Sequence, residues 1–90
     1  MLEPILTNRF KKELTLMKRR GKNIADLKAV MECIQDEQPL PPALRNHPLH
    51  GEYTGKQECH IEDDWLLIYK VRPEAGSVTF YRTGSHADSF

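Results

Sequence analysis

Hydrophobic residues recur with helical spacing in the first third of the chain. From Thr7 onward, Phe10, Leu14 and Met17 fall on one stripe at positions i, i+4 and i+7, and basic residues occupy the opposite side. Gly21 is expected to end this segment, because glycine readily adopts the left-handed conformation that closes a helix. The pattern therefore predicts one amphipathic helix between Thr7 and Gly21 that packs through a single face.

A second helix is predicted after a short break. Asn23 is a favourable N-cap, and Asp26 stands three residues later, as in a capping box. The apolar stripe of this helix consists of Ile24, Leu27, Met31 and Ile34. The prolines at 39, 41 and 42 cannot continue a helix, because proline lacks the N–H group and its ring clashes with the preceding turn. This proline cluster separates predicted helices from predicted strands.

The second half of the chain has the composition and spacing of β-strands. Residues 53–61 alternate loosely, residues 65–71 are dense in aromatic and branched side chains, and residues 77–83 form a third candidate. The connections at 62–64 and 72–76 are short enough for hairpins. We therefore expect an antiparallel meander of three strands.

The chain begins with a short apolar segment, Leu2 to Leu6, which Pro4 restricts to the edge of a sheet. Ninety residues are enough for one domain and leave no room for a second. The predicted architecture is thus a single α+β domain over residues 1–90. Two N-terminal helices pack on one face of a small, mostly antiparallel sheet, and the other face is left for function.

The composition is that of an ordinary globular protein, with 39% apolar and 29% charged residues. No apolar run approaches the roughly 20 residues that a membrane-spanning helix needs. The N-terminus lacks the basic and apolar regions of a signal peptide. We therefore expect a cytoplasmic protein. Cys33 and Cys59 lie far apart without a metal-binding spacing, so we expect both to be free thiols.

The formal net charge is zero, but the charge is unevenly distributed. Residues 1–28 contain eight Lys or Arg and only three acidic residues. A basic segment of this kind suits contact with phosphates or with an acidic partner. It also suits a solvated helix face, which is the interpretation that charge alone favours.

Four histidines, all in the second half, are the main candidates for chemistry: His47, His50, His60 and His86. Asp64 lies at the turn before the strand at 65–71, and Arg82 lies near the end of the last strand. Neighbouring strands are about 4.8 Å apart, so residues near aligned strand ends can converge. The meander would therefore bring His60, Asp64 and Arg82 together and lead the chain on to His86.

Imidazole, carboxylate and guanidinium groups together suit the cleavage of a phosphodiester. RNA supplies its own nucleophile, the 2′-hydroxyl, so the protein needs a base for that hydroxyl, an acid for the departing 5′-oxygen and a cation for the charged intermediate. Imidazole can take and give a proton near neutral pH. Guanidinium matches phosphate oxygens in a bidentate way. This chemistry requires neither a metal nor another cofactor, and we expect none.

Structural roles are the alternatives for each of these residues. Any one histidine is more often a surface or capping residue than a catalyst. Asp64 could be a turn residue, Trp65 a core residue, and Arg82 the cation of a structural salt bridge. A metal site is a further alternative, because His47 and His50 are spaced i, i+3. Proline and glycine around them argue against a helix there, and zinc needs three or four ligands at one point. The residues alone leave a ribonuclease as one hypothesis among these.

Three segments resemble the motifs of a toxin family. Residues 47–51, HPLHG, resemble its HPLxG segment, and residues 60–69, HIEDDWLLIY, resemble its HxxxDWxLIY strand pair. Residues 82–87, RTGSHA, together with Phe90 resemble its RTGTHxxxF ending. With these segments in the same order and the same helix-first layout, the chain resembles the YafQ branch of the RelE/ParE toxin superfamily.

The resemblance implies a ribosome-dependent mRNA endoribonuclease, the toxin of a type II toxin–antitoxin pair. The family's catalytic set would fall on His47, His60, Asp64 and His86, with His86 as the proton donor to the leaving group. Arg82 would stabilise the phosphate in the transition state. Contacts with RNA would come from Phe90, by stacking on a base, and from Trp65, Lys11, Lys12, Lys18 and Arg19.

The same resemblance implies partners. They are a cognate antitoxin, the mRNA in the ribosomal A site, and ribosomal RNA as the target of the first helix. The free toxin is expected to be monomeric, and His50 is expected to be peripheral. Two rivals share the fold: a gyrase-inhibiting toxin of the ParE branch, which lacks this histidine set, and a non-catalytic module that binds an antitoxin and represses its operon.

Overall fold

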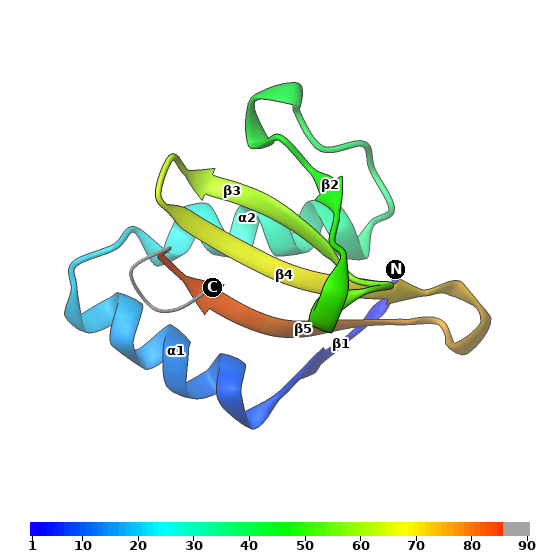
Figure 1. The fold of residues 1–90 in the computed structure, drawn as a ribbon, viewed down its shortest axis with the longest axis horizontal. Helices are drawn as coiled ribbons and strands as arrows, with labels where there is room; N and C mark the ends of the chain where they lie inside the picture. The colour runs from blue at the N-terminus through cyan, green and yellow to red at the C-terminus, as the bar shows by residue number, and fades with distance from the viewer. Residues whose placement is uncertain (86–90) are drawn as a thin grey trace.

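A computed structural model describes residues 1–85 of the chain. In this part, two helices pack on a five-stranded sheet with the strand order β1-β5-β4-β3-β2 (Figure 1). The elements are β1 (Glu3–Leu6), α1 (Asn8–Arg19), α2 (Ile24–Gln35), β2 (His47–Pro48), β3 (Gln57–Glu62), β4 (Trp65–Arg72) and β5 (Ser77–Gly84). Short 3₁₀ turns are η1 (Pro42–Leu44), η2 (Gly51–Tyr53) and η3 (Pro73–Ala75).

Both predicted helices are confirmed, together with the residues that begin and end them. The Thr7 hydroxyl accepts a hydrogen bond from the N–H of Phe10 at 3.0 Å, and Gly21 has a φ of +78° just beyond α1. The Asn23 side chain accepts from the N–H of Ala25 at 3.0 Å and so caps α2. Within the described part of the chain, no helix is long and apolar enough to cross a membrane.

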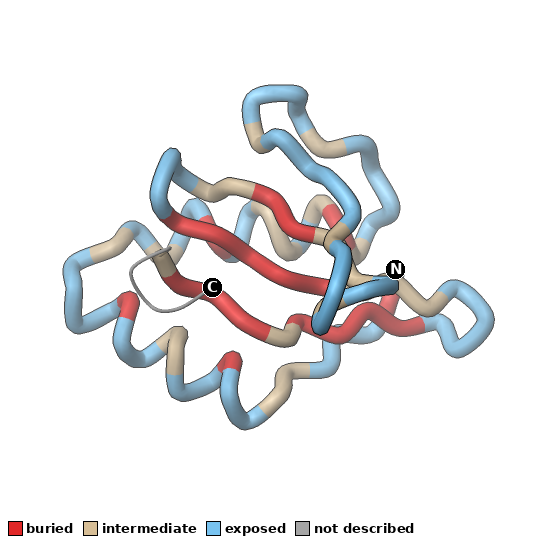
Figure 2. The backbone as a smooth tube through the Cα atoms, viewed as in Figure 1, coloured by how far each residue is buried: buried red, intermediate tan, exposed pale blue. Residues whose placement is uncertain are grey.

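The apolar stripes of both helices pack on one face of the sheet, as predicted. Phe10 and Met17 of α1 and Leu27 and Ile34 of α2 belong to one buried cluster. The sheet contributes residues of β3, β4 and β5 to this cluster: Cys59, Trp65, Leu67, Tyr69, Val78 and Phe80. Figure 2 shows that the buried backbone follows β4 and β5 through the middle of the molecule. The centre of the sheet therefore supports whatever lies on its other face.

The predicted meander of β3, β4 and β5 is confirmed, and the sheet extends beyond it on both sides. β1 pairs in parallel with β5, with Glu3 opposite Ser77 and Leu6 opposite Phe80. β2, a two-residue strand that the sequence did not predict, pairs with β3. Pro48 is compatible with that position because an edge strand leaves one N–H position unpaired. The addition of β2 is what brings His47 onto the sheet.

Both cysteines are free thiols, as predicted, but their surroundings differ. Cys59 is fully buried, and burial, together with the nearby Glu58 carboxylate, raises the pKa of its thiol to about 12. Cys33 is partly exposed. Because the thiolate is the reactive form, Cys59 should be inert in the folded protein.

We therefore expect a chromogenic disulfide reagent to modify one thiol of the native protein at mildly alkaline pH. The second thiol should react only after unfolding in denaturant. The variant Cys33→Ser should show no rapid reaction before unfolding. Two equally fast thiols in the native protein would contradict the packing around Cys59.

Candidate active site

The sheet register places three polar site residues in one row. His47 on β2 pairs with Glu58 on β3, Glu58 pairs with Ile68 on β4, and Ile68 pairs with Arg82 on β5. Directly paired residues point to the same face of a sheet. Ile68 is buried but is not part of the cluster that contains the helix side chains, so this row lies on the face opposite the helices. Residues from four strands thus meet on one surface.

Glu58 lies between two histidines. Its Oε1 atom is 3.4 Å from Nε2 of His47 and 3.7 Å from Nε2 of His60. The centroids of the two imidazole rings are 6.0 Å apart. The Glu58 side chain is only 12% exposed, so water screens these contacts weakly. The result is a compact acid–base cluster made from two strands, which we call the His47–Glu58–His60 cluster.

Contacts with Arg45 determine which ring nitrogens of the two histidines carry a proton. Nδ1 of His60 is 3.2 Å from the Arg45 guanidinium, which can only donate, so this nitrogen accepts and the ring proton is on Nε2, facing Glu58. Nδ1 of His47 is 2.8 Å from the Arg45 carbonyl oxygen, which can only accept. His47 therefore donates there, and its contact with Glu58 is most favourable when the ring carries both protons. Both contacts suit a Glu58 carboxylate that is ionised.

Arg82 is held by a helix on one side and a turn on the other. Its Nε atom lies 3.2 Å from both carboxylate oxygens of Glu13 on α1, and Nη2 also bonds to Glu13. Nη1 donates to the Tyr53 hydroxyl at 3.1 Å. The hydrogen bond to Glu13, opposed by burial and assisted by Tyr53, raises the pKa of Arg82. This fixed positive charge stands at the β5 end of the row.

Asp64, another predicted catalytic residue, lies at the end of the β3–β4 hairpin. Asp64 is exposed in the turn that joins the two strands. His60 is inside β3, opposite Leu66, so the turn lies just past it along the same hairpin. His86 and Phe90 fall outside the described residues. The structure thus brings His47, His60 and Arg82 to one face and places Asp64 at the edge of that face.

Trp65 requires a correction. It was expected to contact RNA, but it is fully buried, and its Nε1 atom donates to Thr83 Oγ1 at 2.9 Å. The Thr83 hydroxyl donates in turn to the Leu66 carbonyl at 2.9 Å. An indole ring without exposed surface cannot stack on a base. Trp65 instead joins β4 to β5 beneath the row and supports the site from the core.

The basic residues of α1 do not join the His47–Glu58–His60 cluster. Lys11, Lys12, Lys18 and Arg19 are exposed on a helix that packs on β5, whereas the cluster lies on β2 and β3 at the other side of the sheet. They remain candidates for a separate contact with RNA. His50 is exposed and precedes η2, which is consistent with its peripheral assignment.

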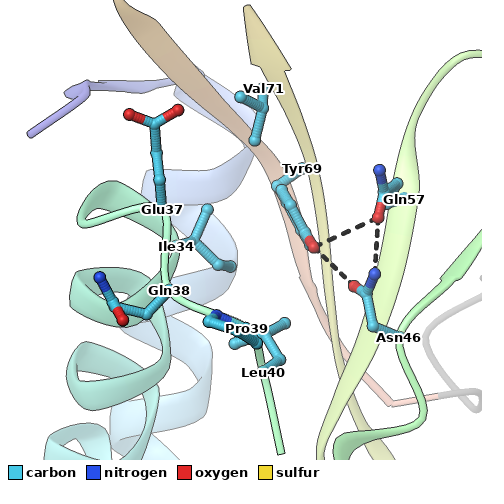
Figure 3. Close-up of a pocket in the computed structure, with 9 residues that line it drawn as sticks. All are labelled: Ile34, Glu37, Gln38, Pro39, Leu40, Asn46, Gln57, Tyr69 and Val71. Atoms are coloured by element: carbon cyan, nitrogen blue, oxygen red, sulfur yellow. Dashed lines mark hydrogen bonds between the residues drawn. The ribbon is translucent and has the colours of Figure 1, made fainter. Parts of the chain in front are cut away.

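A hydrogen-bonded network behind the site fixes the start of β2. The Tyr69 hydroxyl donates to Oδ1 of Asn46 at 2.6 Å, and the Asn46 amide donates to Oε1 of Gln57 at 2.6 Å (Figure 3). These side chains line an open pocket of about 370 Å³ between α2 and the sheet. Burial is the main cause that raises the pKa of Tyr69 to about 12, so its hydroxyl stays a donor at neutral pH. Because Asn46 directly precedes His47, the network positions that histidine.

Tyr69→Phe is therefore expected to destabilise the protein by about 1 kcal/mol, because Oδ1 of Asn46 loses its donor. Urea denaturation measures this loss. The folded-state pKa is raised above that of an unfolded tyrosine, so this stabilising contribution is present below about pH 10 and is lost as the pH rises towards 12. The stability difference between wild type and Tyr69→Phe should shrink over that interval. A difference that persists unchanged would show that the hydroxyl is not the cause.

The His47–Glu58–His60 cluster also has the donors of a metal site. Among the described residues, the candidate ligand atoms of these three side chains all lie within 4.8 Å of one another. Two imidazoles and a carboxylate are the protein ligands of many catalytic zinc sites, which keep an open fourth position. These three residues differ from the pair His47 and His50, which the sequence spacing suggested as metal ligands. The geometry is therefore compatible with acid–base catalysis and with binding a transition-metal ion.

A family model described as the bacterial toxin of type II toxin–antitoxin system, YafQ, matches residues 2–90. The chain belongs to the YafQ toxin family. The mRNA interferase toxin YafQ of Escherichia coli strain K12 is 36% identical over 85 residues, which cover 93% of this chain and 90% of the relative. The resemblance inferred from the three sequence segments is thus confirmed.

Solved structures of bacterial toxins match the whole fold. A metal-bound toxin from Helicobacter pylori has a TM-score of 0.93 and 32% identity, and the match covers 100% of both chains. The E. coli DinJ–YafQ complex matches with a TM-score of 0.87 and 34% identity over 100% of this chain and 99% of the other. The predicted α+β architecture is therefore shown both by the structure and by its similarity to these toxins.

Sequence reasoning missed Glu58, Glu13 and Tyr53. Glu58 had a usable signal, because it stands two residues before His60 in a predicted strand and must share its face. Glu13 had none, since it lies on the first helix, 69 residues from Arg82 along the chain. Tyr53 was assigned to a strand but lies in η2, where its hydroxyl reaches Arg82. In this YafQ-family member, the two missed carboxylates neutralise the basic groups of the site.

Proposed function

We propose that this protein is an mRNA-cleaving toxin and that the His47–Glu58–His60 cluster, Arg82, Asp64 and His86 form its active site. The main support for this proposal is the position of Glu58, whose carboxylate faces both imidazoles on the sheet surface opposite the helices. The E. coli relative at 36% identity is an mRNA interferase toxin, which supports the same activity for this chain. The gyrase-inhibiting alternative does not need such a cluster.

The proposed reaction begins at the RNA 2′-hydroxyl. Glu58 accepts its proton, and the 2′-oxygen forms a bond to the adjacent phosphorus. The Arg82 charge and protonated His47 stabilise the negative charge that develops on the phosphate oxygens. The bond from phosphorus to the 5′-oxygen then breaks, and His86 protonates that oxygen. The products are a 2′,3′-cyclic phosphate and a 5′-hydroxyl end.

The proposed setting is the bacterial cytoplasm, on translating ribosomes. The exposed α1 residues Lys11, Lys12, Lys18 and Arg19 give one side of the molecule a basic surface that suits ribosomal RNA. A cognate antitoxin would hold the toxin inactive, as the DinJ–YafQ complex indicates for the E. coli relative. Phe90 would orient the mRNA by stacking on a base.

Primer extension on a translated message, with purified ribosomes, tests this proposal. We expect new stops at fixed positions in the reading frame when protein and ribosomes are both present, and none with the double variant His47→Ala/His60→Ala. The variant His50→Gln should cut like wild type. Induced expression of wild type or His50→Gln should arrest growth, whereas induced expression of the double variant should not. Equal arrest by wild type and the double variant would favour a non-catalytic module instead.

Metal ions should inhibit this reaction rather than support it. The RNA supplies the nucleophile and the protein supplies the proton transfers, so toxin that has been treated with EDTA and then freed of it should cleave the translated message at an unchanged rate. Zinc or copper ions at the His47–Glu58–His60 cluster would occupy the lone pairs that accept protons. We expect toxin loaded with zinc to cleave more slowly, and EDTA treatment of that toxin before the assay to restore the rate. Loss of activity after EDTA treatment of the toxin alone would overturn the metal-free mechanism.

A further inference from the structure

A second group of basic and aromatic side chains lies on the same face of the sheet. We call Tyr53, Lys56, Lys70, Arg72 and Tyr81 the cationic patch. Nζ of Lys56 is 4.7 Å from the centroid of the Tyr81 ring and 5.9 Å from that of Tyr53. All five side chains are partly exposed.

The strand geometry fixes where the patch lies. Lys70 and Arg72 are two and four residues beyond Ile68 on β4, so they share its face and continue away from the row at about 7 Å per two residues. A β-carbon added to Gly55 would be 3.6 Å from Nζ of Lys70, so the segment after η2 lies directly over this lysine. In Figure 1 this green segment crosses in front of β4 and β5.

Tyr53 connects the patch to the proposed active site. Its ring faces Lys56, and its hydroxyl accepts the hydrogen bond from Arg82. Tyr81 is bound by the Arg72 side chain, and this bond lowers the pKa of Tyr81, assisted by the charges of Lys56 and Lys70 and opposed by partial burial. Three cations therefore converge on two aromatic rings beside Arg82, and Arg72 among them also feels the charge of Glu74.

We propose that the cationic patch binds the single-stranded RNA substrate on one side of the scissile phosphate and guides it over Arg82 into the His47–Glu58–His60 cluster. Single-stranded RNA carries a negative phosphate at each nucleotide and exposes flat bases. A surface that combines cations with aromatic rings can bind both. The exposed lysines of α1 have no exposed aromatic ring beside them, because Phe10 is buried, so they suit a duplex or folded RNA backbone better. The inference rests on the proposed function, because it assigns a substrate subsite to that activity.

Fluorescence anisotropy with an uncleavable 2′-O-methyl RNA of about ten nucleotides tests the patch apart from catalysis. The triple variant Lys56→Gln/Lys70→Gln/Arg72→Gln should bind at least about tenfold more weakly than wild type. Each lost phosphate contact should also lower the slope of log affinity against log salt by about 0.7. The matched control is Lys28→Gln, an exposed lysine on α2, which should leave affinity and slope unchanged. A dinucleotide, too short to reach the patch, should bind wild type and triple variant alike.

Equal affinity of the triple variant and Lys28→Gln for the longer RNA would overturn the proposal, even if wild type cleaves mRNA. Normal binding of the oligonucleotide with weakened binding of ribosomes would also overturn it and assign the patch to ribosomal RNA. Normal RNA binding with weakened antitoxin binding would overturn it in favour of a protein contact. Circular dichroism of each variant shows whether a loss comes from unfolding.

Discussion

Glu58→Gln is expected to lower the rate of RNA cleavage by about 10²–10⁴-fold, because it removes a carboxylate positioned for proton transfer. Glutamine has the same shape and can still accept a hydrogen bond, so the strand and its register should remain. What changes is the negative charge that His47 and His60 face at 3.4 and 3.7 Å. Single-turnover cleavage on saturated ribosomes measures the chemical step without the binding step.

Glu62→Gln is the matched control for this variant. Glu62 ends the same strand, is exposed, and pairs with Lys22 at 3.0 Å on the surface. Surface pairs of this kind contribute about 0–1 kcal/mol, and Glu62 does not face the histidines. A Glu58→Gln protein that cleaves at the Glu62→Gln rate would remove Glu58 from the mechanism and leave His60 or Asp64 as the base.

Glu13→Ala is expected to cost about 3–5 kcal/mol of folding free energy, because it leaves the Arg82 guanidinium buried without its counterion. The two side chains are only 5% and 14% exposed, so solvent cannot replace the lost carboxylate. Glu13 also accepts a hydrogen bond from the Thr83 N–H at 3.3 Å, and that bond would be lost as well. Urea denaturation of purified protein gives the change directly.

A double variant separates the ion pair from general damage to α1. Arg82→Met combined with Glu13→Ala removes both charges, so the pair should lose less stability than the sum of the two single variants. Glu32→Ala on α2 is exposed and should change stability by less than about 0.5 kcal/mol. Additive losses in the double variant would show that Glu13 and Arg82 act independently.

The sequence predicts the helices and the meander because their signals are local. The Thr7 and Asn23 caps, the apolar stripes, and the glycine at 21 all act within a few residues, and tertiary packing agrees with each of them. The segment at 65–71 is predicted as a strand from its aromatic and branched residues, and in the structure this strand extends to Arg72. Its dense apolar composition also reflects burial on both faces, as Leu66 and Ile68 show opposite the helix side.

The remaining features depend on contacts between distant segments. No local pattern shows that β1 pairs in parallel with β5, or that Pro48 belongs to a strand. The partner of Arg82 could not be predicted, because the Glu13 carboxylate comes from another element. Trp65 was misassigned because an aromatic residue beside Asp64 suits both stacking on RNA and packing in the core. Only its buried contact with Thr83 distinguishes the two.

The two faces of the sheet have different roles: one is packed for stability, and the other carries the proposed active site. Helix side chains and the Asn46–Tyr69–Gln57 network stabilise one face and hold the strands in register. The other face carries the His47–Glu58–His60 cluster, Arg82 and the cationic patch. The network and the proposed active site share strands β3 and β4. Substitutions on the helix face that shift these strands should therefore also displace the active-site side chains.

The most direct test of the central claim uses an mRNA with a single 2′-deoxynucleotide at the mapped cleavage position, translated by purified ribosomes. If the His47–Glu58–His60 cluster activates the 2′-hydroxyl, the all-ribose message is cut and its upstream fragment ends in a 2′,3′-cyclic phosphate. The deoxy-substituted message should stay intact at that position. Equal cutting of both messages would contradict the account, because it would require a nucleophile other than the RNA itself.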